Sequence, residues 1–168
     1  EADLSSVILH PRLYHAQAVA FEKDRLSWKV LDESIAADFE LLASAAHGDF
    51  QLVSRDDADE TWIVLYNSDI KPPTFYRYDR KNRKLALLFT TRPKLQDYAL
   101  SPMTPVRIKA RDGLSLQAYM TLPAAVSARP LPMILHVHGG PWARDIWGYH
   151  PEVQWLANQG YAVLQLNF

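Results

Sequence analysis

One stretch of the sequence decides the fold: Met133-Ile134-Leu135-His136-Val137-His138-Gly139-Gly140-Pro141-Trp142. Its first five residues form an almost continuous apolar run, which is typical of a strand that is covered on both faces of a parallel sheet. Residues 151–159 predict a short helix, because proline suits the first turn of a helix and Gly160 suits its end. Residues 161–167 predict a second buried strand. The order strand, loop, helix, strand is that of a crossover unit in an α/β sheet.

Upstream of this unit the sequence predicts a β-hairpin and, before it, a domain boundary. Residues 106–110 and 114–122 alternate apolar and polar side chains around Asp112-Gly113. An Asp-Gly pair between alternating runs is a strong hairpin signal. Residues 92–105 carry prolines and show no periodicity, so we expect a linker there.

The first hundred residues predict short antiparallel strands. Four strand-like runs of regular spacing, separated by charged or proline-bearing turns, occupy residues 50–53, 62–66, 74–78 and 84–89. Four short strands in about 40 residues is the size of one β-propeller blade. Residues 16–21 and 26–31 predict two strands of a preceding blade. Residues 35–45 predict a helix that Asp32 or Ser34 caps.

The two glycines that follow the apolar run are the candidate chemical site. Glycine lets the backbone turn sharply and brings N–H groups close to a substrate. After such a strand, a backbone N–H can stabilise the negative charge that develops on a carbonyl oxygen during acyl transfer. Pro141 has no N–H, so the donor would be Gly139 or Gly140. The alternative interpretation is that the two glycines only form a tight turn.

The order of these features resembles the junction of two domains in the prolyl oligopeptidase family, and most of all its acylaminoacyl-peptidase and dipeptidyl-peptidase-like branch. The resemblance rests on the Asp112-Gly113 hairpin, on His138-Gly139-Gly140-Pro141, and on residues 158–163 leading to Asn167-Phe168. It covers essentially the whole chain and is strongest over residues 106–168. It implies a mixed fold: the last one to two blades of an all-β propeller over residues 1–100, then the incomplete N-terminal part of an α/β-hydrolase domain over residues 101–168.

The resemblance also implies an activity. Members of the family are serine-type peptidases that hydrolyse short peptides through an acyl-enzyme, and their propeller restricts access to the site. By position, Gly140 resembles the backbone donor of the oxyanion hole, with Gly139 beside it. His138 stands where some members carry a tyrosine that serves the same hole. We expect the Gly140 N–H, rather than the His138 ring, to be the donor.

The catalytic triad is expected to lie outside these residues. No Gly-x-Ser-x-Gly sequence, which carries the nucleophile of α/β-hydrolases, occurs in the 168 residues. The acid and the histidine of the triad follow the nucleophile in such enzymes. We therefore expect a fragment that is inactive alone, because no acyl-enzyme forms without an activated serine.

Residues around the glycines suggest further contacts. Trp142 and Arg144 are candidates for substrate binding, with Arg144 receiving a peptide carboxylate or pairing with the propeller. The alternative is a loop packed by its own tryptophans. His136 and His138 lie two apart on a strand, but no further ligand is spaced to complete a metal site, so a packed, hydrogen-bonded His136 is favoured. No metal and no cofactor are expected.

The composition excludes several other kinds of protein. The chain carries 18 basic and 19 acidic residues, a net charge of -1, so no large electrostatic field attracts nucleic acid or a membrane surface. No apolar run is long enough to span a bilayer, and no signal peptide is visible. The absence of cysteine excludes disulfides and thiol catalysis. We expect a soluble protein, with a cytoplasmic location favoured over a periplasmic one.

Two other functions fit the same motifs: an esterase of the same fold, and a propeller-containing binding module with a degenerate hydrolase domain. The expected partner of a peptidase is a short peptide substrate, and neither nucleic acid nor a membrane. Because sheets lose neighbours in a fragment, we expect residues 163–166 to be exposed at a strand edge. The chain would then form a homo-oligomer or pair with the missing part of the polypeptide.

Overall fold

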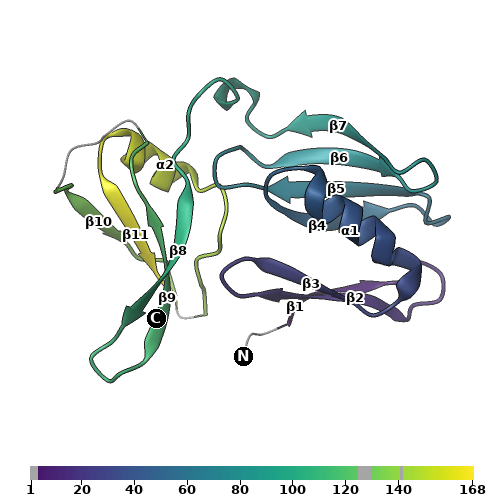
Figure 1. The fold of residues 1–168 in the computed structure, drawn as a ribbon, viewed down its shortest axis with the longest axis horizontal. Coiled ribbons are helices and arrows are strands. Elements are labelled where there is room, and N and C mark those ends of the chain that lie inside the picture. The colour runs from purple at the N-terminus through teal and green to yellow at the C-terminus, as the bar shows by residue number, and fades with distance from the viewer. Residues whose placement is uncertain (1–3, 125–129, 141) are drawn as a thin grey trace. The chain divides into compact units, whose positions relative to one another are not determined.

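The computed structural model describes residues 4–124, 130–140 and 142–168, and they fall into two compact units. The first unit comprises the chain up to Ser68 together with Pro72–Gln96, and the second comprises Asp69–Lys71 and Asp97–Phe168. Most of the regular structure in the described residues is β-sheet (Figure 1). Within these residues no helix combines the length and the apolar character that a bilayer crossing requires.

The first unit contains two antiparallel sheets and a helix. The three-stranded sheet has the order β1-β2-β3 and the four-stranded sheet the order β4-β5-β6-β7. The elements are β1 (Leu4–Leu9), β2 (Ala16–Glu22), β3 (Leu26–Val30), the 3-10 turn η1 (Glu33–Ile35), α1 (Ala36–Ala45), β4 (Asp49–Arg55), β5 (Thr61–Asn67), β6 (Thr74–Asp79), β7 (Lys84–Thr90) and the 3-10 turn η2 (Pro93–Leu95).

The sequence predicted six of these strands and the helix, and the structure confirms them. Asp32 is the cap of η1, because its carboxylate accepts the Ser34 N–H. β1 was missed. Its residues do not alternate between apolar and polar, and its pairing with β2 is interrupted by two register shifts, so the strand depends on its partner rather than on a pattern of its own.

The core of the first unit forms where α1 packs on the four-stranded sheet (Figure 1). Phe39 and Leu42 of α1 meet the alternating buried residues of β5, which are Trp62, Val64 and Tyr66. The Tyr66 hydroxyl donates to the Leu42 carbonyl at 2.6 Å. Burial raises the pKa of Tyr66, so this donor keeps its proton at all ordinary pH values.

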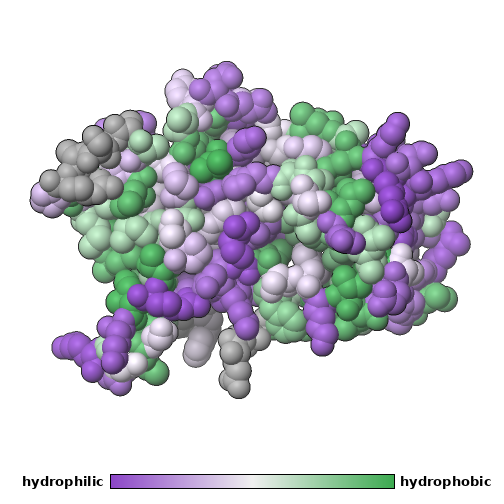
Figure 2. All heavy atoms as spheres, viewed as in Figure 1, coloured by the Kyte–Doolittle hydropathy of each residue, from purple (hydrophilic) through white to green (hydrophobic). Residues whose placement is uncertain are grey.

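A charged network holds α1 to the ends of β4–β7. The Arg80 guanidinium bonds the carboxylates of Asp38 at 2.9 Å and Asp59 at 2.6 Å, and it stacks 4.7 Å from the centre of the Trp62 ring. Trp62 in turn donates from its indole N–H to Asp59 at 2.7 Å. Asp59 belongs to the acidic turn between β4 and β5, and with the β6–β7 turn it makes this end of the sheet strongly hydrophilic (Figure 2).

The second unit contains one mixed sheet and a helix. Its elements are β8 (Met103–Lys109), β9 (Ser115–Thr121), β10 (Met133–His136), α2 (Pro151–Asn158) and β11 (Ala162–Leu166). The strand order is β10-β11-β9-β8, in which β10 and β11 are parallel and the other pairs antiparallel. The Asp-Gly hairpin is confirmed: Gly113 has φ +91°, which glycine adopts without strain.

The burial of this sheet differs from the prediction. Residues 163–166 are not at an exposed edge: β11 is a central strand, and Val163 and Leu164 are 0% and 8% exposed. The edge strand is β10, whose Met133 and Leu135 are 58% and 52% exposed. The prediction that residues 133–137 are covered on both faces was therefore wrong for the described residues, since α2 covers one face and no described element covers the other.

The proline-bearing stretch before β8 is ordered by a buried side chain of α2. The amide of Gln154 donates to the carbonyls of Ser101 and Asp69 at 2.7 and 3.0 Å, and it accepts the Ser101 N–H at 2.9 Å. The Asp69 carboxylate accepts the Met103 N–H at 2.9 Å. These side-chain bonds satisfy backbone groups that have no partner in a strand. They explain how a segment without regular secondary structure adopts a single conformation.

We expect Arg80→Gln to lower the free energy of unfolding of the first unit by about 3 kcal/mol, because the largely buried Asp38 carboxylate loses its cation and Asp59 keeps only Arg55. Urea denaturation of both proteins would measure the difference. Arg77→Gln, at an exposed position of β6, is the matched control and should change stability by less than about 0.5 kcal/mol. A loss of equal size in both variants would contradict the role given to Arg80.

Candidate functional site

The loop after β10 holds the residues that the sequence selected. β10 ends at His136; His138, Gly139 and Gly140 follow after one intervening residue, and both glycines are exposed. Pro141, the fourth residue of the motif, lies outside the described residues. Among the described residues, neither glycine N–H takes part in a hydrogen bond. The loop therefore presents backbone donors that its own residues do not consume.

The glycines are not required by local strain. Neither Gly139 nor Gly140 has a positive φ, and a Cβ added at either position would have no atom within 4 Å among the described residues. The tight-turn interpretation, which needs a backbone conformation unfavourable to other residues, gains no support from this geometry. What the two glycines do provide is open space next to the backbone.

The His138 ring is fixed by two contacts. It stacks on Phe168 with 4.7 Å between ring centres and an angle of 3° between planes. Its Nδ1 lies 2.8 Å from the Gly139 carbonyl oxygen, which can only accept, so Nδ1 carries the proton. His138 Nε2 is then the acceptor nitrogen, and it is buried without a partner among the described residues. The ring thus holds the backbone of the glycine next to it.

Trp142 and Arg144, the other two predicted site residues, differ in their contacts. Trp142 is 96% exposed and contributes nothing to packing of the loop. Arg144 donates to the Gln117 side chain of β9 at 2.6 Å. The alternative prediction, a loop packed by its own tryptophans, applies to Trp147, which is 3% exposed and donates to the Met103 carbonyl at 2.8 Å.

The end of the loop is attached to α2 and β10 by two histidines. His150 Nδ1 accepts the Val153 N–H at 3.3 Å and so caps the N-terminus of α2. The His150 ring meets the His136 ring edge to face, with 5.0 Å between centres, and His136 Nε2 lies 3.3 Å from the Glu152 carboxylate. The prediction of a hydrogen-bonded His136 is confirmed.

The part of the chain that the structure describes holds no group of three His, Cys, Asp or Glu side chains that could bind a metal ion.

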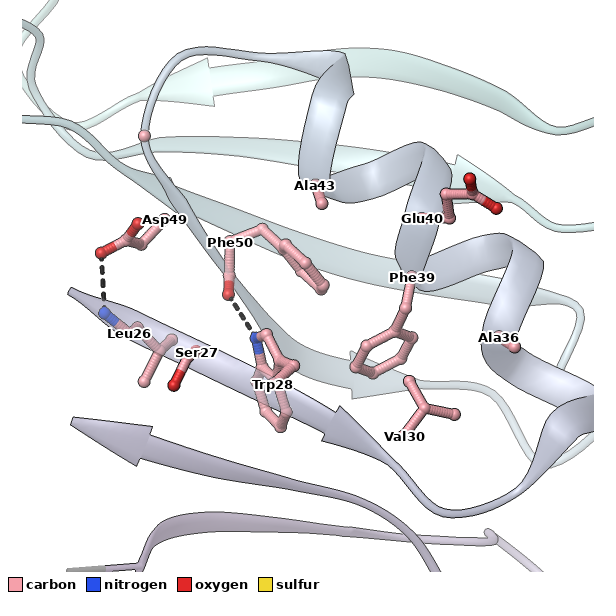
Figure 3. Close-up of a pocket in the computed structure, with 11 residues that line it drawn as sticks. Leu26, Ser27, Trp28, Val30, Ala36, Phe39, Glu40, Ala43, Asp49 and Phe50 are labelled. Atoms are coloured by element: carbon pink, nitrogen blue, oxygen red, sulfur yellow. Dashed lines mark hydrogen bonds between the residues drawn. The ribbon is translucent and has the colours of Figure 1, made fainter. Parts of the chain in front are cut away.

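A pocket that sequence reasoning missed lies in the first unit. It has a volume of about 440 Å³ and opens between β3, α1 and the start of β4 (Figure 3). The rings of Trp28, Phe39 and Phe50 line it, and the Trp28 indole donates to the Phe50 carbonyl at 3.0 Å. Asp49 at its rim is already bound by Arg25 at 2.6 Å. The sequence did not indicate the pocket. It forms between two sheets, and the alternation of residues within a strand does not show how its sheet packs against another.

The cap of α2 makes the stability of the second unit sensitive to pH. Burial first, and then the neighbouring His136, lower the pKa of His150 below its ordinary value of about 6.5. The folded state therefore binds fewer protons than the unfolded state, so stability is complete above pH 6.5 and is lost as the pH falls below it. Protonation of Nδ1 also removes the acceptor that caps the helix.

We expect the urea midpoint of the wild-type chain to fall between pH 7.5 and pH 5.5, and His150→Asn to remove most of this dependence. Asparagine caps helices well but does not titrate. His47→Asn, at an exposed position of the first unit, is the control that should leave the dependence unchanged. Equal slopes in all three proteins would show that His150 does not carry the effect.

No family model matches the chain, but proteins of known sequence do. The chain is 44% identical to dipeptidyl aminopeptidase BIII of Pseudoxanthomonas mexicana over 99% of its length, and it spans 25% of that protein. It is 33% identical to dipeptidyl peptidase family member 6 of Caenorhabditis elegans, again over 99% of the chain and 26% of the relative. The chain therefore spans about a quarter of the length of the curated relatives it matches.

Solved structures share the fold at lower identity. Acylaminoacyl peptidase of Pyrococcus horikoshii matches 99% of the chain and 25% of its own length, with a TM-score of 0.63 and 19% identity. Dipeptidyl peptidase 4 of Porphyromonas gingivalis matches 99% of the chain and 24% of its own length, with a TM-score of 0.68 and 17% identity. The resemblance predicted from the sequence is confirmed: these 168 residues are homologous to one part of the dipeptidyl peptidases and belong with them to the prolyl oligopeptidase family.

Proposed function

We propose that the chain is part of a serine-type peptidase that hydrolyses short peptides through an acyl-enzyme. In this proposal residues 1–100 are the last part of a β-propeller, with β4–β7 as a complete blade. Residues 101–168 are the first part of an α/β-hydrolase domain. The observation that carries the proposal is the loop after β10, where two consecutive exposed glycines carry backbone N–H groups that no described residue uses.

The geometry of the loop supports Gly140 as the oxyanion donor. The peptide unit between Gly139 and Gly140 is planar, and its C=O and N–H point in opposite directions. Because His138 Nδ1 binds the Gly139 carbonyl, the Gly140 N–H is turned to the side away from the imidazole. His138 is therefore a positioning residue in this proposal, and its ring does not itself contact the oxyanion. A fixed donor of this kind costs no reorganisation when charge develops on the substrate.

The nucleophile and its base come from outside the 168 residues in this proposal. No Gly-x-Ser-x-Gly sequence occurs among them, and in α/β-hydrolases the acid and the histidine follow the nucleophile along the chain. The chain alone would accordingly hold one oxyanion donor and no acyl acceptor, and it would be inactive. The uncovered apolar face of β10 supports the idea that further polypeptide, in the same protein or in a second copy, packs against this sheet.

Substrate contacts are proposed for Trp142 and Arg144, which follow the glycines in the same loop. Trp142 offers an almost fully exposed indole, and a large aromatic surface of that kind suits an apolar side chain of a peptide. Arg144 donates to the Gln117 side chain, and in this proposal its guanidinium also receives a peptide carboxylate, for which two parallel N–H donors are well suited.

The protein that contains this chain in full tests the proposal. It should react with a fluorophosphonate probe, which requires an activated serine, and it should cleave dipeptidyl p-nitroanilides in preference to short-chain p-nitrophenyl esters. Preference for the esters would favour an esterase. No labelling would favour a binding module with a degenerate hydrolase domain, and either result would overturn the proposal.

In the same protein, Gly140→Pro should lower kcat by about 10²- to 10³-fold, because it removes one oxyanion donor. Gly140→Ala keeps the N–H at a position without a positive φ, so it is the matched control and should retain activity within a few-fold. Steady-state kinetics on one dipeptidyl substrate would compare the two. Similar losses in both variants would mean that the Gly140 N–H is not the donor.

A further inference from the structure

Buried polar atoms without partners gather on the face of the second unit's sheet that α2 covers. Asp145 is 8% exposed and Gln165 is 1% exposed. Gln165 Nε2 donates to Asp145 Oδ1 at 2.9 Å, but Asp145 Oδ2 and Gln165 Oε1 have no hydrogen-bond partner among the described residues. His136 is the cross-strand neighbour of Gln165 on β10, and its Nδ1 is also buried without a partner there. We call these three atoms the acceptor cluster.

Every member of the acceptor cluster accepts hydrogen bonds. Asp145 Oδ2 is a carboxylate oxygen, and Gln165 Oε1 is the carbonyl end of an amide whose nitrogen already donates to Asp145. His136 Nε2 faces the Glu152 carboxylate, which can only accept, so Nε2 carries a proton, and in the neutral ring Nδ1 presents a lone pair. What the cluster lacks is a donor.

The charge of the cluster indicates the kind of donor. Asp145 forms no ion pair within the described residues, and a buried carboxylate without a cation is costly. A water molecule would supply two O–H donors but no charge. A guanidinium supplies five donors in one plane, a positive charge and no acceptor, which suits a buried carboxylate oxygen and the carbonyl oxygen of the amide bound to it.

The site is also held in place before any ligand arrives. The Asp145 N–H donates to Asn167 Oδ1 at 2.7 Å, and the Asn167 amide donates back to the Asp145 carbonyl at 3.0 Å. Gln165 lies in the central strand β11. A site whose acceptors are fixed by a backbone pair and a central strand loses little entropy on binding.

We propose that Asp145 and Gln165, with His136 beside them, bind the guanidinium group of an arginine side chain. The arginine comes either from further polypeptide of the same protein or from a peptide ligand. The inference rests on the buried acceptors alone and does not depend on the proposed peptidase activity.

The 168-residue chain itself can be tested with methylguanidinium. The ion should shift the Gln165 side-chain NH₂ signals in ¹H–¹⁵N NMR spectra in a saturable way, whereas N-methylurea, which is planar but neutral, should not at the same concentration. Asp145→Asn should raise the dissociation constant at least tenfold. Asp97→Asn, at an exposed position of the same unit, should leave it unchanged. No saturable shift, or equal binding of N-methylurea, would overturn the proposal.

A stability measurement without ligand separates a binding carboxylate from a structural one. Asp145→Asn removes an unpaired buried charge and lets the new amide donate to Gln165 Oε1, so the variant should melt at or above the wild-type temperature. A variant that melts well below the wild type, or does not fold, would show that the carboxylate serves the fold and would overturn the proposal.

The source of the arginine follows from comparing two probes. An Ala-Arg dipeptide that binds at least tenfold more tightly than methylguanidinium would identify a peptide ligand, because the site would then hold more than the side chain. Equal affinities would identify a side chain of the protein. Failure of both probes would overturn the proposal while leaving the fluorophosphonate test of the catalytic serine untouched.

Discussion

The parallel pairing of β10 with β11 is the constraint on which the second unit depends. Parallel neighbours cannot be joined by a tight turn, so the chain must leave β10, cross one face of the sheet and return. That connection contains the glycine loop, Trp147 and α2. Because Trp147 is anchored to β8 and His150 caps α2, the loop is held at its far end as well as at the strand. The candidate chemistry lies in the part between these anchors.

The first unit depends on a different kind of interaction. Its strands are short and its two sheets are joined by polar side chains as much as by apolar packing. Arg55 of β4 donates to Gln17 of β2 at 2.8 Å, and Trp28 of β3 donates to the backbone of β4 at 3.0 Å. Such bonds fix the sheets in one relative position, which apolar contacts alone specify less sharply. Arg55 also donates to the Asp59 carboxylate of the β4–β5 turn at 3.0 Å.

The strength of the local signals decided what the sequence could predict. Period-two alternation, Asp112-Gly113 and Pro151 with Gly160 each encode a conformation within a few residues, and the strands, the hairpin and α2 were found from them. Burial was harder to predict. An apolar run at residues 133–137 indicates a strand, but it does not say which face is covered in a given stretch of polypeptide. β1 was missed because its order comes from pairing with β2.

The candidate site shows the same division. Gly139 and Gly140 could be chosen because their residue type and their place after a strand carry chemical meaning. The contact of His138 with the Gly139 carbonyl could not be predicted, because the sequence does not determine which of several orientations the histidine ring adopts. The acceptor cluster was invisible as well: Asp145 and Gln165 lie 20 positions apart, and only the fold brings an aspartate of a loop over a glutamine of a central strand.

The position of β10 at the edge of its sheet has a consequence for the loop that follows it. The backbone amides of a central strand are hydrogen-bonded to strands on both sides and exchange with solvent more slowly than those of an edge strand. The amides of β11 and β9 should therefore exchange slowly and those of β10 faster. The Gly139–Gly140 peptide unit follows that edge strand after two intervening residues. Polypeptide that packs on the exposed apolar side of β10 would therefore restrain the start of the loop without touching the glycines, in addition to the anchors at Trp147 and His150.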